Sequence, residues 1–223
     1  MKRTKLAARQ LPAYTRGEEL TNMITHIFGA AIGLAALVAC GLRAAFQGNG
    51  VGVAACAVYG AACVAMFTIS SVYHGLRPCL GKKVMQVIDH CTIYYLIAGT
   101  YTPVVLSGLR PVYPHIAWGL FFFEWGLALA ATVLTAIDLK KYSVFSMCCY
   151  IGMGWAVIPF WRQTVLVMGK NGFSLLLAGG IAYTIGSVLY GLGSRRRWMH
   201  SVFHVFVVCG AVLQAISVLL YAV

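Results

Sequence analysis

Long apolar runs alternate with short polar segments along almost the entire chain. A membrane-crossing helix needs about 20 mostly apolar residues. The runs of that length cover residues 20–42, 51–75, 86–107, 112–137, 142–161, 172–193 and 199–222. The segments between them are turn-like, such as QGNG at 47–50. The pattern predicts an all-α polytopic membrane protein: a single seven-transmembrane helix bundle over residues 20–223, preceded by a basic tail at residues 1–19.

Composition supports a membrane protein over a soluble one. Hydrophobic residues make up 61% of the chain and charged residues 10%, too little charge to cover the surface of a soluble domain. Residues 1–19 contain no apolar stretch of the kind found in a cleavable signal peptide. We therefore expect the first span to direct membrane insertion. The eight cysteines form no CxxC pair, which favours free thiols over a disulfide framework.

The basic residues predict how the chain is oriented. Of its 17 lysines and arginines, 13 fall in the N-terminal tail and in every second loop. This bias predicts a cytoplasmic N-terminus and an external C-terminus, the inverse of a G-protein-coupled receptor. A retinal protein is also excluded, because residues 199–223 contain no lysine for a Schiff base. The net charge of +12 is assigned to contacts with anionic membrane lipids, and no nucleic-acid partner is expected.

Four polar residues fall at a similar predicted depth near the cytoplasmic side. His74 ends the second span, Asp89 lies near the start of the third, and His200 and His204 open the seventh. Residues i and i+4 share one helix face, so His200 and His204 can contact one ion. Three neutral imidazoles suit Zn²⁺, which would leave a fourth position for water. Ser70, one turn before His74, and Asp89 are candidates to hold that water or take its proton.

The same residues carry a family resemblance over residues 17–223. EELTNMITHIFGAAIG at 18–33, SSVYHGL at 70–76, DHCTIYYLIAGTYTP at 89–103 and HSVFH at 200–204 resemble the motifs of the bacterial hemolysin III family. That family belongs to the progestin and adipoQ receptor superfamily. The DH…IYYLIAGTYTP block is long, which makes the resemblance specific.

The resemblance implies a seven-helix bundle of the bacterial inner membrane with a zinc site near its cytoplasmic face. It implies that His74, His200 and His204 are the metal ligands, and it matches Ser70 and Asp89 to the family's serine and aspartate. It also implies a metal-dependent hydrolase of lipid amide or ester bonds, involved in membrane homeostasis. The superfamily's hormone receptors carry a long soluble N-terminal region, whereas the tail here is short.

The remaining polar residues have structural interpretations. Thr15 and Glu18 fit a helix-capping box, and capping is preferred for Glu18 and Glu19. Asp138 is interpreted as a solvated loop charge. Glu124 lies in the middle of a span, where an ionised carboxylate costs about 2.5 kcal/mol or more, so it should be neutral or hydrogen-bonded.

Three further histidines and two prolines lie in or beside the predicted spans. His26 is expected to line the metal site rather than bind the ion, His90 to face headgroups or another helix, and His115 to lie at the outer interface. Pro103 and Pro159 fall inside predicted spans, where they would kink the helices.

The leading hypothesis is a zinc-dependent lipid hydrolase in which Asp89 is the general base and Ser70 helps to stabilise the oxyanion. One alternative is a zinc-stabilised receptor or regulator without turnover. Another is a cytolytic pore, which would need a polar path through all seven spans. Haem binding is disfavoured because haem ligands usually come from two facing helices.

Overall fold

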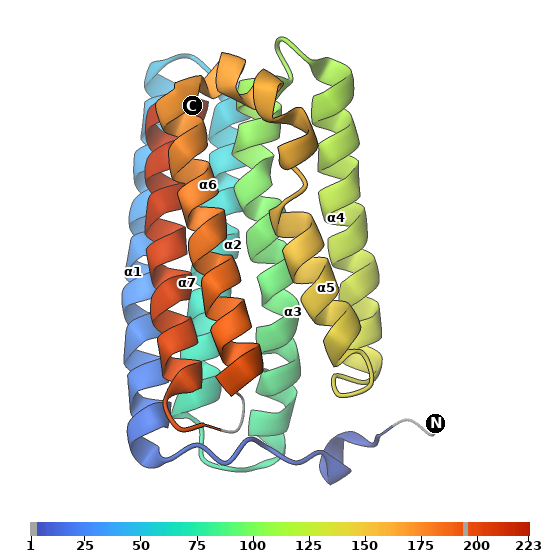
Figure 1. Cartoon of the computed structure of the whole chain (residues 1–223). Helices are drawn as coiled ribbons and strands as arrows, with labels where there is room; N and C mark the ends of the chain where they lie inside the picture. Colours follow the sequence, from blue (N-terminus) through green and yellow to red (C-terminus); the bar gives the residue numbers. More distant parts are fainter. Residues whose placement is uncertain (1–3, 194–195) are drawn as a thin grey trace.

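A computed structural model describes residues 4–193 and 196–223 as an all-helical bundle without strands (Figure 1). Lys2, Arg3 and Arg195, which contribute to the charge bias, lie outside the described residues. The α-helices are α1 (Arg16–Phe46), α2 (Gly50–Gly75), α3 (Leu80–Pro103), α4 (Pro114–Ile137), α5 (Ser143–Gly154), α6 (Trp161–Gly193) and α7 (Met199–Ser217). Short 3₁₀ turns cover Leu6–Ala8 and Ile158–Phe160, and π-helical turns cover Val104–Leu109 and Val218–Ala222.

Among the described residues, five stretches are long and apolar enough to cross a membrane. They are α1, α2, α4, the stretch Ser143–Leu192 that contains α5 and α6, and the stretch Met199–Ala222 that contains α7. The helix α3 is not one of them; it is less apolar than the others and carries Lys82, Lys83 and Asp89 in its first half. The count of seven spans and the side on which each terminus lies stay predictions.

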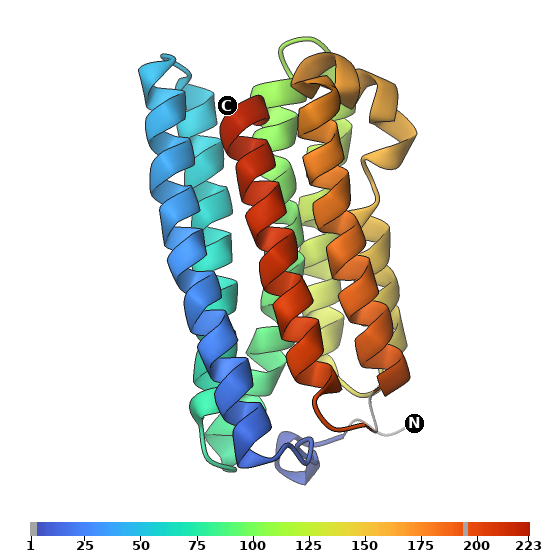
Figure 2. The ribbon, with the colours of Figure 1, turned by 60° about the vertical axis from the view of Figure 1, so that its left-hand side comes forward.

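Consecutive helices run up and down, and most pack beside their sequence neighbours. The helix α1 packs on α2, α2 on α3, and α3 on α4, while α7 lies between α1 and α6 (Figure 2). The helices α1 and α2 approach closely at Gly60, where a Cβ atom would collide with Leu37. Small residues permit this approach and the dispersion contacts that hold helices together in lipid. The two termini lie at opposite ends of the bundle (Figure 1).

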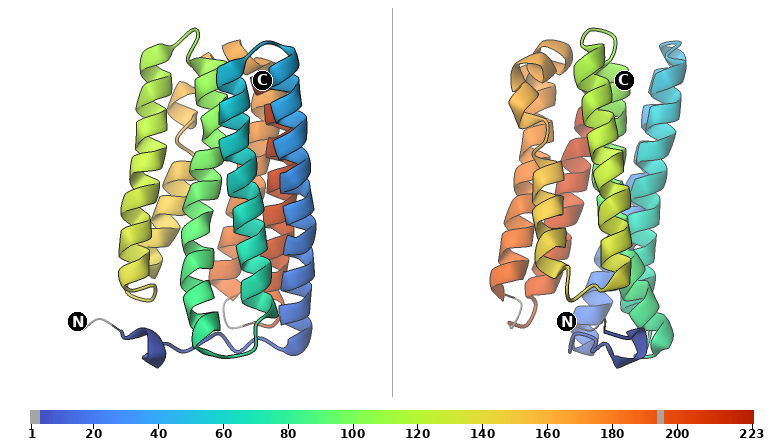
Figure 3. Two further views of the ribbon diagram at one scale, coloured as in Figure 1. Left: turned by 180° about the vertical axis from the view of Figure 1, so that it is seen from behind. Right: turned by 90° about the vertical axis from the view of Figure 1, so that its right-hand side faces the viewer.

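The region predicted as the fifth span departs most from the expected helix. The α-helix α5 ends at Gly154, well short of the predicted 161, and Pro159 lies in the following 3₁₀ turn rather than inside an α-helix. The next helix, α6, is kinked at Gly169, whose φ of 71° is accessible to glycine. The helices α4 and α5 form one edge of the bundle, where α5 is visibly the shorter (Figure 3).

Pro103 ends α3 without a sharp kink. It is followed by the π-helical turn Val104–Leu109, which continues in the right-handed helical region. A proline removes one backbone donor, and a local π-helical adjustment accommodates that loss.

The N-terminal tail crosses the end of the bundle at which α1 begins and reaches the loop between α4 and α5 (Figure 3). The Thr4 amide donates to Asp138 Oδ2 at 2.8 Å, and Arg9 Nη2 donates to the Ile137 carbonyl at 3.3 Å. Asp138 is only 3% exposed, so its interpretation as a solvated loop charge was wrong. We call this N-terminal tail the strap. The hydrogen bond that attaches it to the loop after α4 joins residues that are 134 positions apart in sequence.

Replacing Asp138 by Ala should detach the strap from the loop between α4 and α5, because the Thr4 amide then loses its hydrogen-bond acceptor. Trypsin is expected to cleave after Arg9 faster in Asp138→Ala than in the unmodified protein, as followed by mass spectrometry. Lys140→Ala in the same loop is the control and should leave the rate unchanged. Hydrogen bonds from the backbone amides of Thr4 and Lys141 lower the pKa of Asp138 from 3.8 to about 2. A depressed carboxyl pKa stabilises the folded state above the unfolded value, so protection should be complete at neutral pH and lost as pH falls from about 4 through 2.

Candidate metal centre

Three histidines from two distant segments lie together, with one ring nitrogen of each within 4.8 Å of the others. They belong to the end of α2 and the start of α7, at the end of the bundle that the strap crosses; Figure 1 shows these two helix ends at the same end of the bundle. His74 lies in the last turn of α2, and His200 and His204 lie in the first two turns of α7. Because α2 ends where α7 begins, the up-and-down topology brings these residues to the same level. The i, i+4 spacing then turns both α7 imidazoles toward α2.

The ring nitrogens of the three histidines face one another. His200 Nε2 lies 3.3 Å from His74 Nε2 and 3.0 Å from His204 Nε2. A neutral imidazole nitrogen offers either one proton or one lone pair, so His200 Nε2 cannot make two ordinary hydrogen bonds at once. A cation between the three nitrogens would satisfy all of them. Tetrahedral coordination at Zn–N distances of about 2.0–2.1 Å separates the ligands by about 3.3 Å, close to the spacing observed.

His74 and His204 are buried, His200 is half-buried, and other aromatic rings pack against all three. His74 is 2% and His204 1% exposed. Tyr14 of the strap stacks on His200 with centroids 4.9 Å apart, and His26 stacks on His204 at 3.7 Å. Burial raises the pKa of the Tyr14 hydroxyl, which keeps that ring uncharged beside the cluster. The expectation that His26 lines the site agrees with its position, while Tyr14 carried no signal in the sequence.

Ser70 and Asp89 lie in the wall of a cavity that two histidines of the cluster, His200 and His204, also line. Ser70 is 1% and Asp89 8% exposed, and both line this cavity together with His200 and His204. The Asp89 carboxyl lies within interaction range of the Ser70 hydroxyl. The three helices α2, α3 and α7 thus bring a carboxylate, a hydroxyl and the imidazole cluster to one place.

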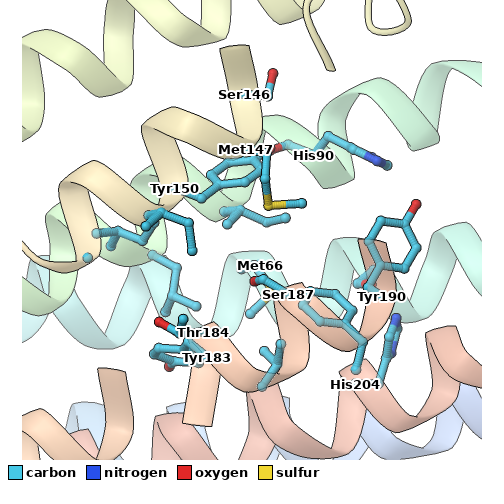
Figure 4. A pocket seen from close by; sticks show the side chains of 18 of the residues that line it. Met66, His90, Ser146, Met147, Tyr150, Tyr183, Thr184, Ser187, Tyr190 and His204 are labelled. Carbon is cyan, nitrogen blue, oxygen red and sulfur yellow. The ribbon is translucent and has the colours of Figure 1, made fainter. Parts of the chain in front are cut away.

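The cavity has a volume of about 240 Å³ and extends from the histidines into the bundle between α3, α5, α6 and α7. Figure 4 shows Tyr190 and His204 at one end and Tyr183 with Thr184 at the other. The remaining wall is mostly apolar and aromatic, with Met66, Leu96, Met147, Tyr150, Trp155 and Phe203 among its residues. The cavity thus joins a polar end, beside histidines that could hold a metal ion, to a mostly apolar chamber.

The structure selects between the two alternatives expected for His90 and for Glu124. His90 lines the cavity inside the bundle, with Nδ1 2.8 Å from the Gln86 carbonyl oxygen, so it faces other helices rather than headgroups. Glu124 is fully buried, and neither carboxyl oxygen has a hydrogen-bond partner among the described residues. Of its two expected states, neutral or hydrogen-bonded, the hydrogen-bonded one is therefore not found. His115 is exposed, near the end of the bundle opposite the metal cluster.

Sequence reasoning missed the residue that contacts a predicted ligand most directly. Glu19 Oε2 lies 2.6 Å from His74 Nδ1, and Glu19 Oε1 accepts from Lys82 Nζ at 2.6 Å. Glu18, its neighbour, makes the expected capping box with Thr15. The sequence interpretation had assigned capping to both glutamates, and only the helix register, which turns Glu19 toward α2, separates them.

The sequence pattern of the haemolysin-III related family matches residues 14–215. The chain belongs to the haemolysin-III related family. It is 34% identical to "Hemolysin-3" of Bacillus cereus over 204 residues, covering 92% of this chain and 91% of the relative. It is 31% identical to "Hemolysin-3 homolog" of Bacillus subtilis strain 168 over 210 residues, covering 94% and 97%.

More distant relatives of this haemolysin-III family chain occur in eukaryotes. The human "Monocyte to macrophage differentiation factor" is 26% identical over 175 residues, covering 74% of this chain and 68% of the relative. "Heptahelical transmembrane protein 4" of Arabidopsis thaliana is 26% identical over 172 residues, covering 66% and 44%. Family membership and the apolar helices together identify a polytopic membrane protein.

We expect the three-histidine cluster to bind one divalent metal ion, and we expect this binding to depend on each of the three imidazoles. We expect His74→Ala, His200→Ala and His204→Ala each to lower the affinity by more than about 100-fold, since even the hydrogen-bond partner of a ligand is worth about 10–100-fold. The measurement is metal analysis of the purified protein combined with chelator competition. His115→Ala, a histidine far from the cluster, is the matched control. Equal metal content in all four variants would contradict the site.

Proposed function

We propose that this haemolysin-III family protein is a zinc-dependent hydrolase of lipid amide or ester bonds in a bacterial inner membrane. One observation carries the proposal. The Asp89 carboxyl, the Ser70 hydroxyl and two imidazoles of the cluster, His200 and His204, line a single, mostly apolar cavity inside a membrane helix bundle. A hydrolase of lipids needs these parts together: a metal, a group that moves a proton, and a chamber for hydrocarbon.

The donor set favours zinc over other divalent ions. Three imidazoles without a thiolate or a hard-oxygen majority suit Zn²⁺, and a catalytic zinc site commonly has three protein ligands and one open position. Zn²⁺ bound by His74, His200 and His204 would supply Lewis acidity, which polarises a carbonyl group and makes water more acidic.

Asp89 is the group that takes the proton from the attacking water in this proposal. It lies in the same wall as His200 and His204, within interaction range of Ser70. A positioned carboxylate that accepts a proton in the transition state contributes about 10²–10⁴-fold to rate. Ser70 donates its hydroxyl hydrogen to the substrate carbonyl, where negative charge develops.

The chamber supports a lipid as the substrate. Its wall beyond the polar end is mostly apolar and includes Leu96, Ile97, Val207 and Phe203, with scattered hydroxyl groups such as that of Thr184, so it offers chiefly apolar contacts, which suit a hydrocarbon chain better than a sugar or peptide. A lipid held there would place its amide or ester group at the level of Asp89 and leave its chain between α3, α5, α6 and α7. The burial of apolar surface would provide the affinity.

A regulator stabilised by the same metal, without turnover, is the second candidate. The clamping of His200 and His204 by Tyr14 and His26 favours a rigid site, which a structural metal also requires. The two candidates differ in what Asp89 does. A regulator needs no group to accept a proton.

Replacing Asp89 by Asn separates these candidates. We expect Asp89→Asn to keep its metal and lower the hydrolysis rate by about 10²–10⁴-fold, because the amide cannot accept a proton. The assay uses purified protein in vesicles with mixed lipid amides and esters, and the released acids are measured by mass spectrometry. Ser143→Ala, in a cavity-lining residue at the start of α5, is the control. An unmodified protein that releases no acid from any lipid would support the regulator instead.

Filling the chamber should change which chain lengths are accepted. Gly180 lines the cavity, and a Cβ atom added there would meet no atom within 4 Å. Gly180→Leu is therefore expected to fold normally, bind metal normally and lose activity toward long chains before short ones. Gly126→Leu on α4, which also has open space around it, is the matched control. A uniform loss across all chain lengths would argue against the chamber as the site of the chain.

A further inference from the structure

One carboxylate links the predicted metal ligand of α2 to a buried lysine of α3. Glu19 on α1 contacts His74 Nδ1 with Oε2 and Lys82 Nζ with Oε1, both at 2.6 Å. The Lys82 ammonium also donates to the Leu76 carbonyl at 2.9 Å and lies 5.1 Å from the centre of the Tyr73 ring. A lysine that is 2% exposed is rare unless it is paired. The arrangement needs an explanation beyond solvation of a surface charge.

We propose that Glu19 and Lys82 are positioning residues that prepare His74 to bind the metal. A carboxylate only accepts hydrogen bonds, so the proton of a neutral His74 ring must sit on Nδ1. His74 Nε2 then carries the lone pair, and it is Nε2 that faces His200. A carboxylate behind a metal-binding histidine fixes both the ring orientation and the proton position. This inference rests on the metal site of the proposed function.

His74 is the ligand that most needs such support. His200 and His204 are held side by side by one helix and are stacked against Tyr14 and His26. Their Nδ1 atoms have no hydrogen-bond partner among the described residues. His74 comes from a different helix and sits within one residue of its end at Gly75, so its position relative to α7 depends on contacts outside α2. Glu19 supplies that contact from α1.

Lys82 acts through Glu19 rather than on the metal. Its ammonium group would repel a cation, but it bonds to the Glu19 oxygen that does not contact His74. The two oxygens of one carboxylate are thereby divided between two partners, which fixes its plane. Because Lys82 also donates to the carbonyl that follows α2, the unit joins the ends of α1, α2 and α3 around a single ligand.

The sequence provides a matched neighbour for each residue of the pair. Glu18 bonds to Thr15 and to the Trp198 amide, and Lys83 bonds to the Ala7 carbonyl. Among the described residues, neither the Glu18 nor the Lys83 side chain forms a hydrogen bond or ion pair with His74, His200 or His204. Glu18→Gln and Lys83→Met therefore remove the same charges as Glu19→Gln and Lys82→Met, one residue away, and they test for nonspecific effects of charge.

The decisive measurement is Zn²⁺ affinity of the purified full chain, determined by chelator competition. Glu19→Gln is expected to weaken affinity by about 10–100-fold, because an amide can donate to Nδ1 and move the ring proton to the metal side. Lys82→Met should weaken it in the same direction, while Glu18→Gln and Lys83→Met should leave it unchanged. In Glu19→Gln/Lys82→Met the two losses should not add, since contacting residues that act as a unit are coupled.

A second readout separates positioning from a purely structural ion pair. Co²⁺ replaces Zn²⁺ as a probe whose visible absorption reports the geometry of its ligands, and melting temperature is measured on metal-free protein. A structural pair would lower the melting temperature in Glu19→Gln but leave both Zn²⁺ affinity and the Co²⁺ spectrum unchanged, and that result overturns the inference. If Glu19→Gln does not fold, the outcome with folded Lys82→Met decides in the same way.

The outcomes also distinguish this inference from the proposed function. Metal binding that depends on Glu19, in a protein that releases no acid from any lipid, would support the inference and reject the hydrolase. An unmodified chain that binds no divalent metal would reject both.

Discussion

The convergence of three imidazole rings where α2 ends and α7 begins is the constraint on which this end of the molecule depends. Nitrogens that face one another at 3.0 and 3.3 Å in a buried place need a shared proton or cation, because lone pairs without a partner are costly there. The neighbouring elements hold the imidazoles in this arrangement. The strap contributes Tyr14, α1 contributes Glu19 and His26, and α3 contributes Lys82.

The irregular backbone between α5 and α6 obeys a related rule. Inside a membrane, unpaired backbone groups are tolerated only where protein or a water-filled cavity satisfies them. At the break after Gly154, one side chain of α3 forms hydrogen bonds with two backbone groups that the α-helix does not pair. The Tyr101 hydroxyl donates to the Gly154 carbonyl at 3.0 Å and accepts from the Val157 amide at 3.1 Å. Both Tyr101 and Gly154 also line the cavity, so the shortened helix and the chamber are parts of one arrangement.

Local sequence patterns predicted the helical class and the histidine cluster. The features that they did not predict depend on tertiary contacts or on details of the backbone. Apolar runs predicted the helical membrane class. The i, i+4 spacing predicted that His200 and His204 share one helix face. Counting the loops predicted that the second span ends on the side where the seventh begins, which places His74 at the same depth as His200 and His204. Asp138 bonds to Thr4 across 134 residues, a pairing that no local pattern contains. The early end of α5 was missed because apolar residues continue through Ile158–Phe160, and hydropathy does not distinguish an α-helix from a buried 3₁₀ turn.

Glu19 and Glu124 show why residue type and depth were insufficient guides. By sequence, Glu124 was the unusual acid because it lies in the middle of a span, and Glu19 was an ordinary residue near a helix start. In the structure Glu124 has no hydrogen-bond partner among the described residues, while Glu19 contacts two buried side chains. A carboxyl in the hydrocarbon region lowers its energy by staying neutral and so needs no counter-ion. A carboxylate that orients an imidazole must stay ionised, which requires a cation such as Lys82 beside it and a location near the bundle's end. The position that looks less unusual in the sequence is therefore the one suited to hold a functional charge.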